Sequence, residues 1–153
     1  MEEFTIICDI KEKLPYSFEN IKPKPKIITQ HLVTGDYSIL GMQHMIAIER
    51  KTLADCFGSV GKGRKRLEAE FQRMQSFDYA ALILESSLSS IFTNPPSHSR
   101  MSSKAVFRTL ISWSIKYHVH IWPCWSREAA EKVCYLILKR YYDMTTAKGI
   151  RND

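Results

Sequence analysis

The first part of the chain alternates short apolar runs with turn-forming residues, a pattern typical of β-strands. Residues 4–8 are apolar and β-branched and predict a buried strand, and residues 27–32 predict a short second strand. Residues 37–40 and 44–49 are separated by a tight turn and predict a hairpin. Residues 22–26 alternate Lys and Pro, which neither a helix nor a central strand accepts, so we expect an extended connector there.

Helical spacing replaces this pattern from Thr52 onward. Apolar residues recur every three or four positions, stop at the glycine-containing stretch 58–63 and resume as far as Met74. Residues 79–84 are a continuous apolar run, which predicts a central strand buried on both faces. We expect the remainder to form one helical turn near residues 88–92, a helix over 103–117, a strand over 119–123, and a last helix that begins at Ser126 and turns Ala130, Val133, Ile137 and Tyr141 inward.

Strands and helices therefore alternate along most of the chain. This order predicts an α/β fold in which a central mixed β-sheet is flanked by helices on both faces. Neither an internal repeat nor a long linker interrupts the pattern. We therefore expect one domain over residues 1–153.

Composition narrows the classes of partner. The chain is 44% apolar and carries a net charge of +6, which suits a soluble protein that binds a polyanion. The acidic N-terminus is unlike a signal peptide, and no apolar run approaches the ~20 residues needed to span a bilayer. We expect an intracellular protein with no membrane partner. Four widely spaced cysteines predict reduced, mostly buried thiols instead of disulfides or a zinc site: Cys8, Cys56, Cys124 and Cys134.

The residues that suggest chemistry lie at the ends of the predicted hairpin strands. Asp36 follows a glycine at the start of one strand, and Glu49 and Lys51 are two apart near the end of the other, so their side chains share one face. Two carboxylates can hold Mg²⁺ or Mn²⁺, and an ammonium group beside them can neutralise charge on a phosphate. The same pattern also fits an ordinary charged strand followed by a helix-capping sequence, Thr52 to Asp55.

The series Gly35-Asp36 … Glu49-Arg50-Lys51-x-x-x-Asp55 is similar to the GD…ERK-x-x-x-D signature of the XPF family of structure-specific endonucleases, which belongs to the PD-(D/E)XK nuclease superfamily. This resemblance implies a restriction-endonuclease-like fold. Four further segments resemble flanking elements of the family in the same order, namely residues 8–13, 63–67, 79–85 and 126–130.

The resemblance also implies roles for individual residues. Asp36, Glu49 and Asp9 would hold the Mg²⁺ or Mn²⁺ ion, with the Arg50 carbonyl as a further ligand, and Lys51 would be the catalytic lysine. The full catalytic set that it implies is Asp9, Glu12, Asp36, Glu49, Arg50, Lys51 and Asp55.

Two surfaces are expected to meet partners. Basic residues at the start of the helix after the signature predict contacts with DNA phosphates, although a solvated helix face would look the same. The last two helices carry more apolar surface than one face requires, and XPF-type nuclease domains pair through helices in this region, so we expect a homodimer through the C-terminal helices. The predicted DNA-binding residues are Lys62, Arg64, Lys65 and Arg66.

The leading hypothesis is thus a metal-dependent endodeoxyribonuclease that hydrolyses phosphodiester bonds in branched, flap, fork or nicked duplex DNA. Such an activity would serve repair, recombination or the replication of a mobile element. A catalytically inactive DNA-binding or dimerisation scaffold of the same fold is one alternative. A restriction or junction-resolving nuclease is another.

Overall fold

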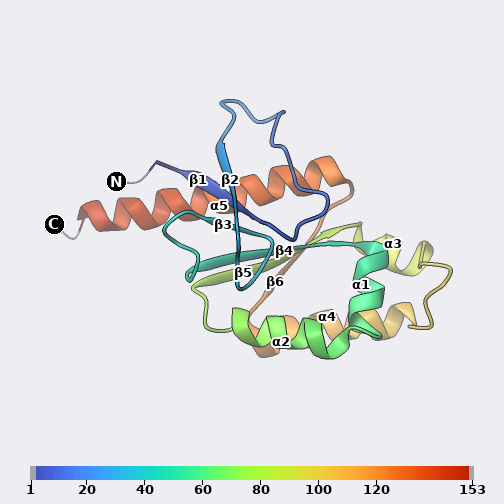
Figure 1. Cartoon of the computed structure of the whole chain (residues 1–153). Helices are drawn as coiled ribbons and strands as arrows, with labels where there is room; N and C mark the ends of the chain where they lie inside the picture. The colour runs from blue at the N-terminus through green and yellow to red at the C-terminus, as the bar shows by residue number, and fades with distance from the viewer. Residues whose placement is uncertain (1–2, 152–153) are drawn as a thin grey trace.

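A mixed β-sheet with helices on both faces forms the core of the computed structural model, which describes residues 3–151 (Figure 1). Helix α5 covers one face of the sheet, and α1, α2 and α4 cover the other. The predicted α/β architecture is therefore confirmed. The elements are β1 (Thr5–Asp9), β2 (Lys26–Gln30), β3 (Tyr37–Ile39), β4 (Ile46–Thr52), α1 (Leu53–Val60), α2 (Arg64–Met74), β5 (Tyr79–Glu85), α3 (Leu88–Thr93), α4 (Ser103–Tyr117), β6 (His120–Pro123) and α5 (Arg127–Arg151).

The sheet has the strand order β2-β1-β3-β4-β5-β6. β3 runs antiparallel to both of its neighbours, β1 and β4, whereas the other neighbouring pairs are parallel. β4 and β5 are both inner strands and pair from Ile46–Tyr79 to Thr52–Glu85. The carboxyl end of β4 therefore lies inside the sheet, where neighbouring strands and helices can surround it.

Strand alternation divides the core into two layers. On β4, Ile46 and Ile48 are fully buried beneath α5, while Ala47 is buried beneath the α1, α2 and α4 layer. The same alternation continues to the end of the strand because successive side chains point to opposite faces. Glu49 therefore shares the face of Ala47, and Arg50 shares the face of α5.

Two helices follow β4 in the chain, as the sequence predicts, and the first starts directly after it. The Thr52 hydroxyl accepts a hydrogen bond from the Asp55 backbone N–H at 3.1 Å, which caps the first turn of α1. After a short glycine-containing connection, α2 buries Leu67, Phe71 and Met74 against the sheet. The capping and the buried stripe hold both helices over the end of β4.

The inward face of α5 differs from the prediction. Ala130 is fully buried as expected, but the buried stripe continues through Cys134 and Leu138. Steps of four residues keep these side chains on one helix face. The other three predicted positions are only partly buried at the border of the core: Val133, Ile137 and Tyr141.

The cysteine prediction is confirmed, because the four thiols are free and buried. Within residues 3–151, no helix has the length and apolar character needed to cross a membrane.

Candidate active site

An open cleft of about 640 Å³ lies where β4 runs into α1. The signature residues meet there because the end of β4, the start of β3 and the segment after β1 all face the same space. α2 forms the opposite wall and contributes Arg66 and Glu70. Six of the seven predicted catalytic residues line this cleft: Glu12, Asp36, Glu49, Arg50, Lys51 and Asp55.

Asp36 is fixed against β4 by its backbone and its side chain. Its N–H donates to the Ile48 carbonyl at 2.7 Å, and its Oδ2 accepts from the Arg50 backbone N–H at 2.8 Å. Gly35 makes this approach possible, because it has a φ of +81° and an added Cβ would lie 3.1 Å from the Ile48 oxygen. The Gly-Asp pair of the signature thus has a steric explanation as well as a chemical one.

The carboxylates in the cleft repel one another. Burial raises the pKa of Asp36 to about 7, and the charges of Glu12 and Glu70 add to this rise. Burial also raises the pKa of Glu49 well above its usual value, helped by Asp36 and Glu70. Asp36 and Glu49 therefore lose their protons less readily than free carboxyl groups, and a divalent cation bound between them would stabilise their charged forms.

Lys51 lies beside these acids on the same face of β4. Its Nζ is 3.3 Å from Glu49 Oε1, which confirms the prediction that the two side chains share one face. Burial alone would lower the pKa of Lys51, but the charge of Glu49, with further contributions from Asp36 and Glu70, raises it above its usual value. Lys51 therefore carries a positive charge at neutral pH.

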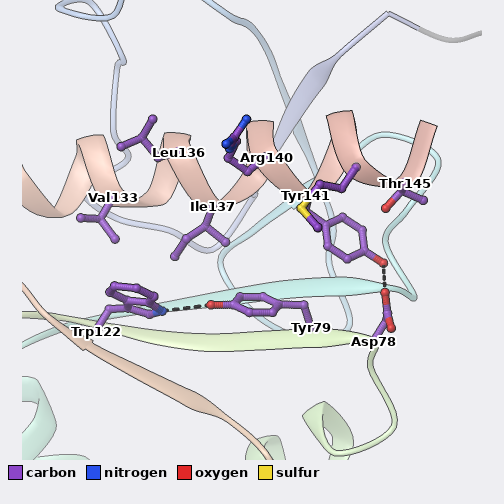
Figure 2. A pocket seen from close by; sticks show the side chains of 10 residues that line it. Asp78, Tyr79, Trp122, Val133, Leu136, Ile137, Arg140, Tyr141 and Thr145 are labelled. Atoms are coloured by element: carbon purple, nitrogen blue, oxygen red, sulfur yellow. Dashed lines mark hydrogen bonds between the residues drawn. The ribbon is translucent and has the colours of Figure 1, made fainter. Parts of the chain in front are cut away.

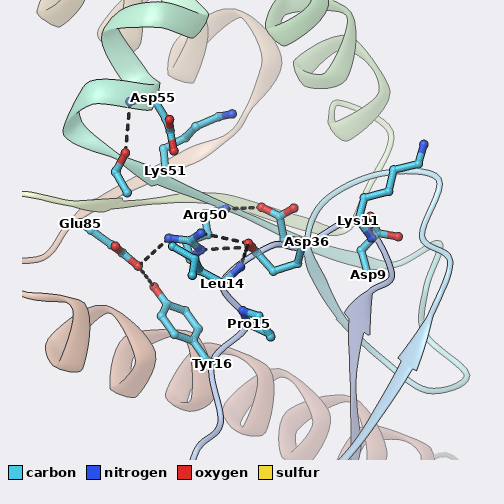
Figure 3. A network of polar contacts seen from close by, with 12 residues as sticks. Asp9, Lys11, Leu14, Pro15, Tyr16, Asp36, Arg50, Lys51, Asp55 and Glu85 are labelled. Atoms are coloured by element: carbon cyan, nitrogen blue, oxygen red, sulfur yellow. Dashed lines mark hydrogen bonds and ion pairs between the residues drawn. The ribbon is translucent and has the colours of Figure 1, made fainter.

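Arg50 points to the other face, where it joins a network of acids (Figure 3). Its Nε and Nη2 bind both oxygens of Glu12 at 3.1 and 2.9 Å, and its Nη1 binds Glu85 Oε1 at 3.1 Å. Tyr16 and Arg127 also donate to Glu85, at 2.6 and 3.3 Å. Burial would raise the pKa of Glu12, but the hydrogen bonds from Arg50 hold it below its usual value. Glu12 therefore lines the cleft as the charged partner of Arg50.

Asp9 does not line the cleft, although its backbone N–H donates to the Asp36 carbonyl at 2.8 Å. Its Oδ1 accepts from the Leu32 backbone N–H at 2.8 Å, and its Oδ2 accepts from the Lys11 backbone N–H at 3.3 Å. The carboxylate thus ties the turn after β1 to the segment after β2. The structure places it as a structural residue, and its role as a metal ligand stays a prediction.

Glu70 is a cleft residue that the sequence signature did not reveal. Its Oε1 accepts from the Gly35 N–H at 2.9 Å, and its charge raises the pKa values of Asp36 and Glu49. On α2 it stands three residues after the buried Leu67, so it lies on the adjacent edge of the inward stripe. A glutamate at the edge of the predicted inward stripe of α2 is the only feature of the sequence that could have indicated Glu70 as a cleft residue.

The predicted DNA-binding residues do not share one surface. Arg66 lines the catalytic cleft, while Lys62 lines a separate hollow next to it. The Arg64 guanidinium lies over the ring of Trp113 at 4.9 Å and donates to Thr109 at 3.3 Å, so it turns toward α4. Lys65 is exposed on α2.

The oxygen donors of the cleft fit a hard divalent cation. Such ions are held by one or two carboxylates, and water and substrate phosphates complete their coordination. Within the described part of the chain, no three His, Cys, Asp or Glu side chains are grouped closely enough to hold a metal alone. Asp36 and Glu49, with Glu70 next to them, nevertheless supply the number and type of protein ligand that Mg²⁺ requires.

The model of the ERCC4 domain family matches residues 8–136, which is most of the chain and includes the whole cleft. The chain belongs to the ERCC4 domain family. No curated protein matches its sequence.

Two solved structures resemble this ERCC4 domain. "XPF from Aeropyrum pernix" has a TM-score of 0.65 and 19% sequence identity, with 93% of this chain and 69% of that chain covered. "XPF from Aeropyrum pernix, complex with DNA" has a TM-score of 0.71 and 17% identity, with 92% of this chain and 66% of that chain covered. The ERCC4 domain thus spans about two thirds of each chain. These matches confirm the XPF-like fold and the resemblance seen in the signature.

Proposed function

We propose that this ERCC4 domain is a divalent-metal-dependent endodeoxyribonuclease that hydrolyses phosphodiester bonds in DNA. The observation that carries the proposal is the meeting of Asp36, Glu49 and Lys51 in one open cleft, where buried carboxylates lie beside a lysine. The pKa values of both acids stay raised even with Lys51 beside them, and grouping such acids costs stability, so a functional role is favoured. The ERCC4 family match and the XPF-like fold support the same conclusion.

The residues of the cleft have separate tasks in this mechanism. Asp36 and Glu49 would hold Mg²⁺ or Mn²⁺, which when bound supplies Lewis-acid stabilisation of phosphate charge and lowers the pKa of water. Lys51 places its ammonium group beside Glu49, where it can neutralise charge that develops on the phosphate oxygens. Arg50 holds the end of β4 in place through its pairs with Glu12 and Glu85 and orients Asp36 through its backbone N–H.

We further propose that the substrate is branched, flap, fork or nicked duplex DNA, encountered in repair, recombination or the replication of a mobile element. The XPF resemblance supports the substrate class, and the solved XPF chain in complex with DNA supports DNA as the polymer. The cleft is open to solvent, which an extended polymer needs in order to enter.

Cleavage assays on defined DNA structures test this function. Wild-type protein and Asp36→Asn are incubated with labelled 3′-flap, fork and plain duplex DNA, with Mg²⁺, with Mn²⁺ or with EDTA. We expect metal-dependent cutting of the branched substrates that Asp36→Asn abolishes, while Glu128→Gln, which removes an exposed acid at the start of α5, leaves it intact. DNA binding without any cutting by the wild type would refute the nuclease and support the scaffold alternative.

We also propose that the domain forms a homodimer through α5 and the edge strand β6. An apolar hollow of about 520 Å³ lies between α5 and the sheet, and the rings of Tyr79 and Trp122 face Val133 and Ile137 across it (Figure 2). The Trp122 side chain is 43% exposed and Leu136 is 51% exposed. A contiguous apolar surface beside a sheet edge favours association with a second copy.

Light scattering at micromolar concentration measures this assembly. We expect a dimer for the wild type and a monomer for Leu136→Glu, because the new charge would be buried in the interface. Val33→Glu is a matched control, since Val33 is also exposed but follows β2 at the opposite edge of the sheet. A wild-type monomer at these concentrations would refute the dimer.

A further inference from the structure

A second hollow, of about 860 Å³, adjoins the catalytic cleft. Ala54 and Gly58 of α1 line both hollows, so the two spaces meet over this helix. The size falls within the roughly 300 to 1,000 Å³ typical of ligand sites in proteins. We call it the lateral groove and define it by six residues, Gly58, Gly61 and Lys62 at the end of α1 and His98, Arg100 and Met101 in the segment between α3 and α4.

The surface of α1 that the cleft and the lateral groove share has no side chain at Gly58. Gly58 is exposed, and a Cβ built on it would meet no atom within 4 Å. Ala54 lies four residues earlier on the same helix face and carries only a methyl group. A polymer strand can therefore lie across this part of α1 without displacing a side chain.

The wall formed by the segment between α3 and α4 is held against α1. An added Cβ at Gly61 would lie 3.0 Å from Met101 Cγ, which shows how closely the Met101 side chain packs there. Phe57 and Pro96 add apolar surface to the same hollow. The lateral groove is therefore a surface supported by packing, with carbon-rich walls that suit the sugar units of a nucleic acid.

The charge of the lateral groove has a single sign. Lys62 and Arg100 line it, and no acidic side chain lines the part of it that the structure describes. The whole sequence from residue 86 to residue 127 lacks Asp and Glu but includes Arg100, Lys104 and Arg108. Lys62 and Arg100 thus make the lining of the lateral groove positive and complementary to phosphates. The adjoining cleft, in contrast, is lined by acidic as well as basic side chains.

We propose that the lateral groove binds the sugar–phosphate backbone of the DNA strand that leaves the catalytic cleft across Gly58, with Lys62 and Arg100 as its phosphate contacts. The proposal rests on the nuclease function, and it defines the path of the substrate. It also revises the DNA surface expected from sequence, because Arg100 takes the place of Arg64, which packs on Trp113.

DNA-binding measurements test this path, and they are made in an Asp36→Asn background so that the DNA is not cleaved. Labelled flap DNA is titrated by fluorescence anisotropy at several salt concentrations. Lys62→Gln combined with Arg100→Gln should weaken binding about tenfold near 0.1 M salt and flatten the salt dependence by about 1.4 to 1.8 in slope, the amount expected for two phosphate contacts. Lys132→Gln, which removes a charge from α5 on the other face of the sheet, should change neither value.

Gly58→Glu and Gly58→Gln form the sharper pair, because the two side chains have the same size and only one is charged. We expect Gly58→Glu to bind DNA at least about threefold more weakly than Gly58→Gln, since its carboxylate would lie in the path of the phosphates. Both substitutions enter open space, so circular dichroism should show folded proteins.

Two results would refute DNA binding in the lateral groove. One is equal binding by the two Gly58 variants, and the other is an unchanged salt slope in the Lys62 and Arg100 double variant. Cleavage by the protein with Asp36 intact is measured on the same DNA in parallel. Binding without cleavage there would refute the nuclease but not the groove, and no binding of any DNA would refute both.

Discussion

Replacing Asp36 with Asn should stabilise the metal-free protein at alkaline pH, even though it removes a proposed metal ligand. The partly buried Asp36 carboxyl lies among other acids, and burial raises its pKa from 3.8 to about 7. Asn is uncharged and nearly the same size, and its side-chain oxygen can still accept the hydrogen bond from the Arg50 backbone N–H. The substitution therefore removes the repulsion and keeps the contact.

The magnitude follows from the difference in proton binding between the folded and unfolded states. Between pH 3.8 and about 7 the folded protein holds a proton on Asp36 that the unfolded chain has released, so the stability of the wild type falls as the pH rises. Above pH 7 the full cost is present. At about 1.4 kcal/mol per pH unit, this rise in pKa corresponds to a gain of up to about 4 kcal/mol for Asp36→Asn at pH 8, and almost none at pH 4.

Urea unfolding in EDTA at pH 4, 6 and 8 measures this difference for the two proteins. The gap in unfolding free energy should widen steadily with pH, and Glu128→Gln should show no such trend. Mn²⁺ at pH 8 should stabilise the wild type more than Asp36→Asn, because only the wild type has the intact ligand pair. A gap that is the same at pH 4 and pH 8, or an Asn variant that is less stable at pH 8, would refute the proposed electrostatics.

Three further substitutions test the residues that hold the active site in place. Arg50→Ala should destabilise the protein by about 3 to 5 kcal/mol in urea unfolding, because two buried carboxylates lose their shared partner, and a loss below 1 kcal/mol would contradict the buried pairing. Gly35→Ala should lower the free energy of unfolding by about 1 to 3 kcal/mol, because Gly35 has a positive φ and an added Cβ would crowd the Ile48 backbone. Thermal melting checks this, and an unchanged melting midpoint would contradict the predicted strain. Thr52→Ala should cost about 1 kcal/mol by removing the cap of α1 at the Asp55 N–H, which the same melting experiment checks.

Local features of the active site could be predicted from sequence because the backbone geometry of a single strand or helix determines them. Glu49 and Lys51 had to share a face of β4, since side chains two apart in a strand project to the same side. The inward stripe of α2 and the cap at Thr52 depend on helical spacing and on one hydrogen bond near in sequence. The same reasoning was less accurate for α5, where Val133 sits at the border of the core.

Contacts between segments far apart in the chain were decided only when the helices packed onto the sheet. Glu70 reaches Gly35 across 35 residues of sequence, and Arg50 finds Glu85 at the same separation, because α2 and β5 both return to the end of β4. Arg64 turned away toward Trp113 for the same kind of reason, since the packed α4 offered an aromatic face.

Sequence by itself thus determined the fold class, the family resemblance and the face on which Glu49 and Lys51 lie. The tertiary structure decided that Glu70 joins the acids of the cleft, that the Asp9 carboxylate binds the Leu32 backbone and does not line the cleft, and that a basic groove opens beside the cleft at Gly58. The reason is physical. Spacing along one element sets the direction of a side chain, but which groups meet, and how far their charges shift one another's pKa values, depends on distances that exist only after the layers have packed.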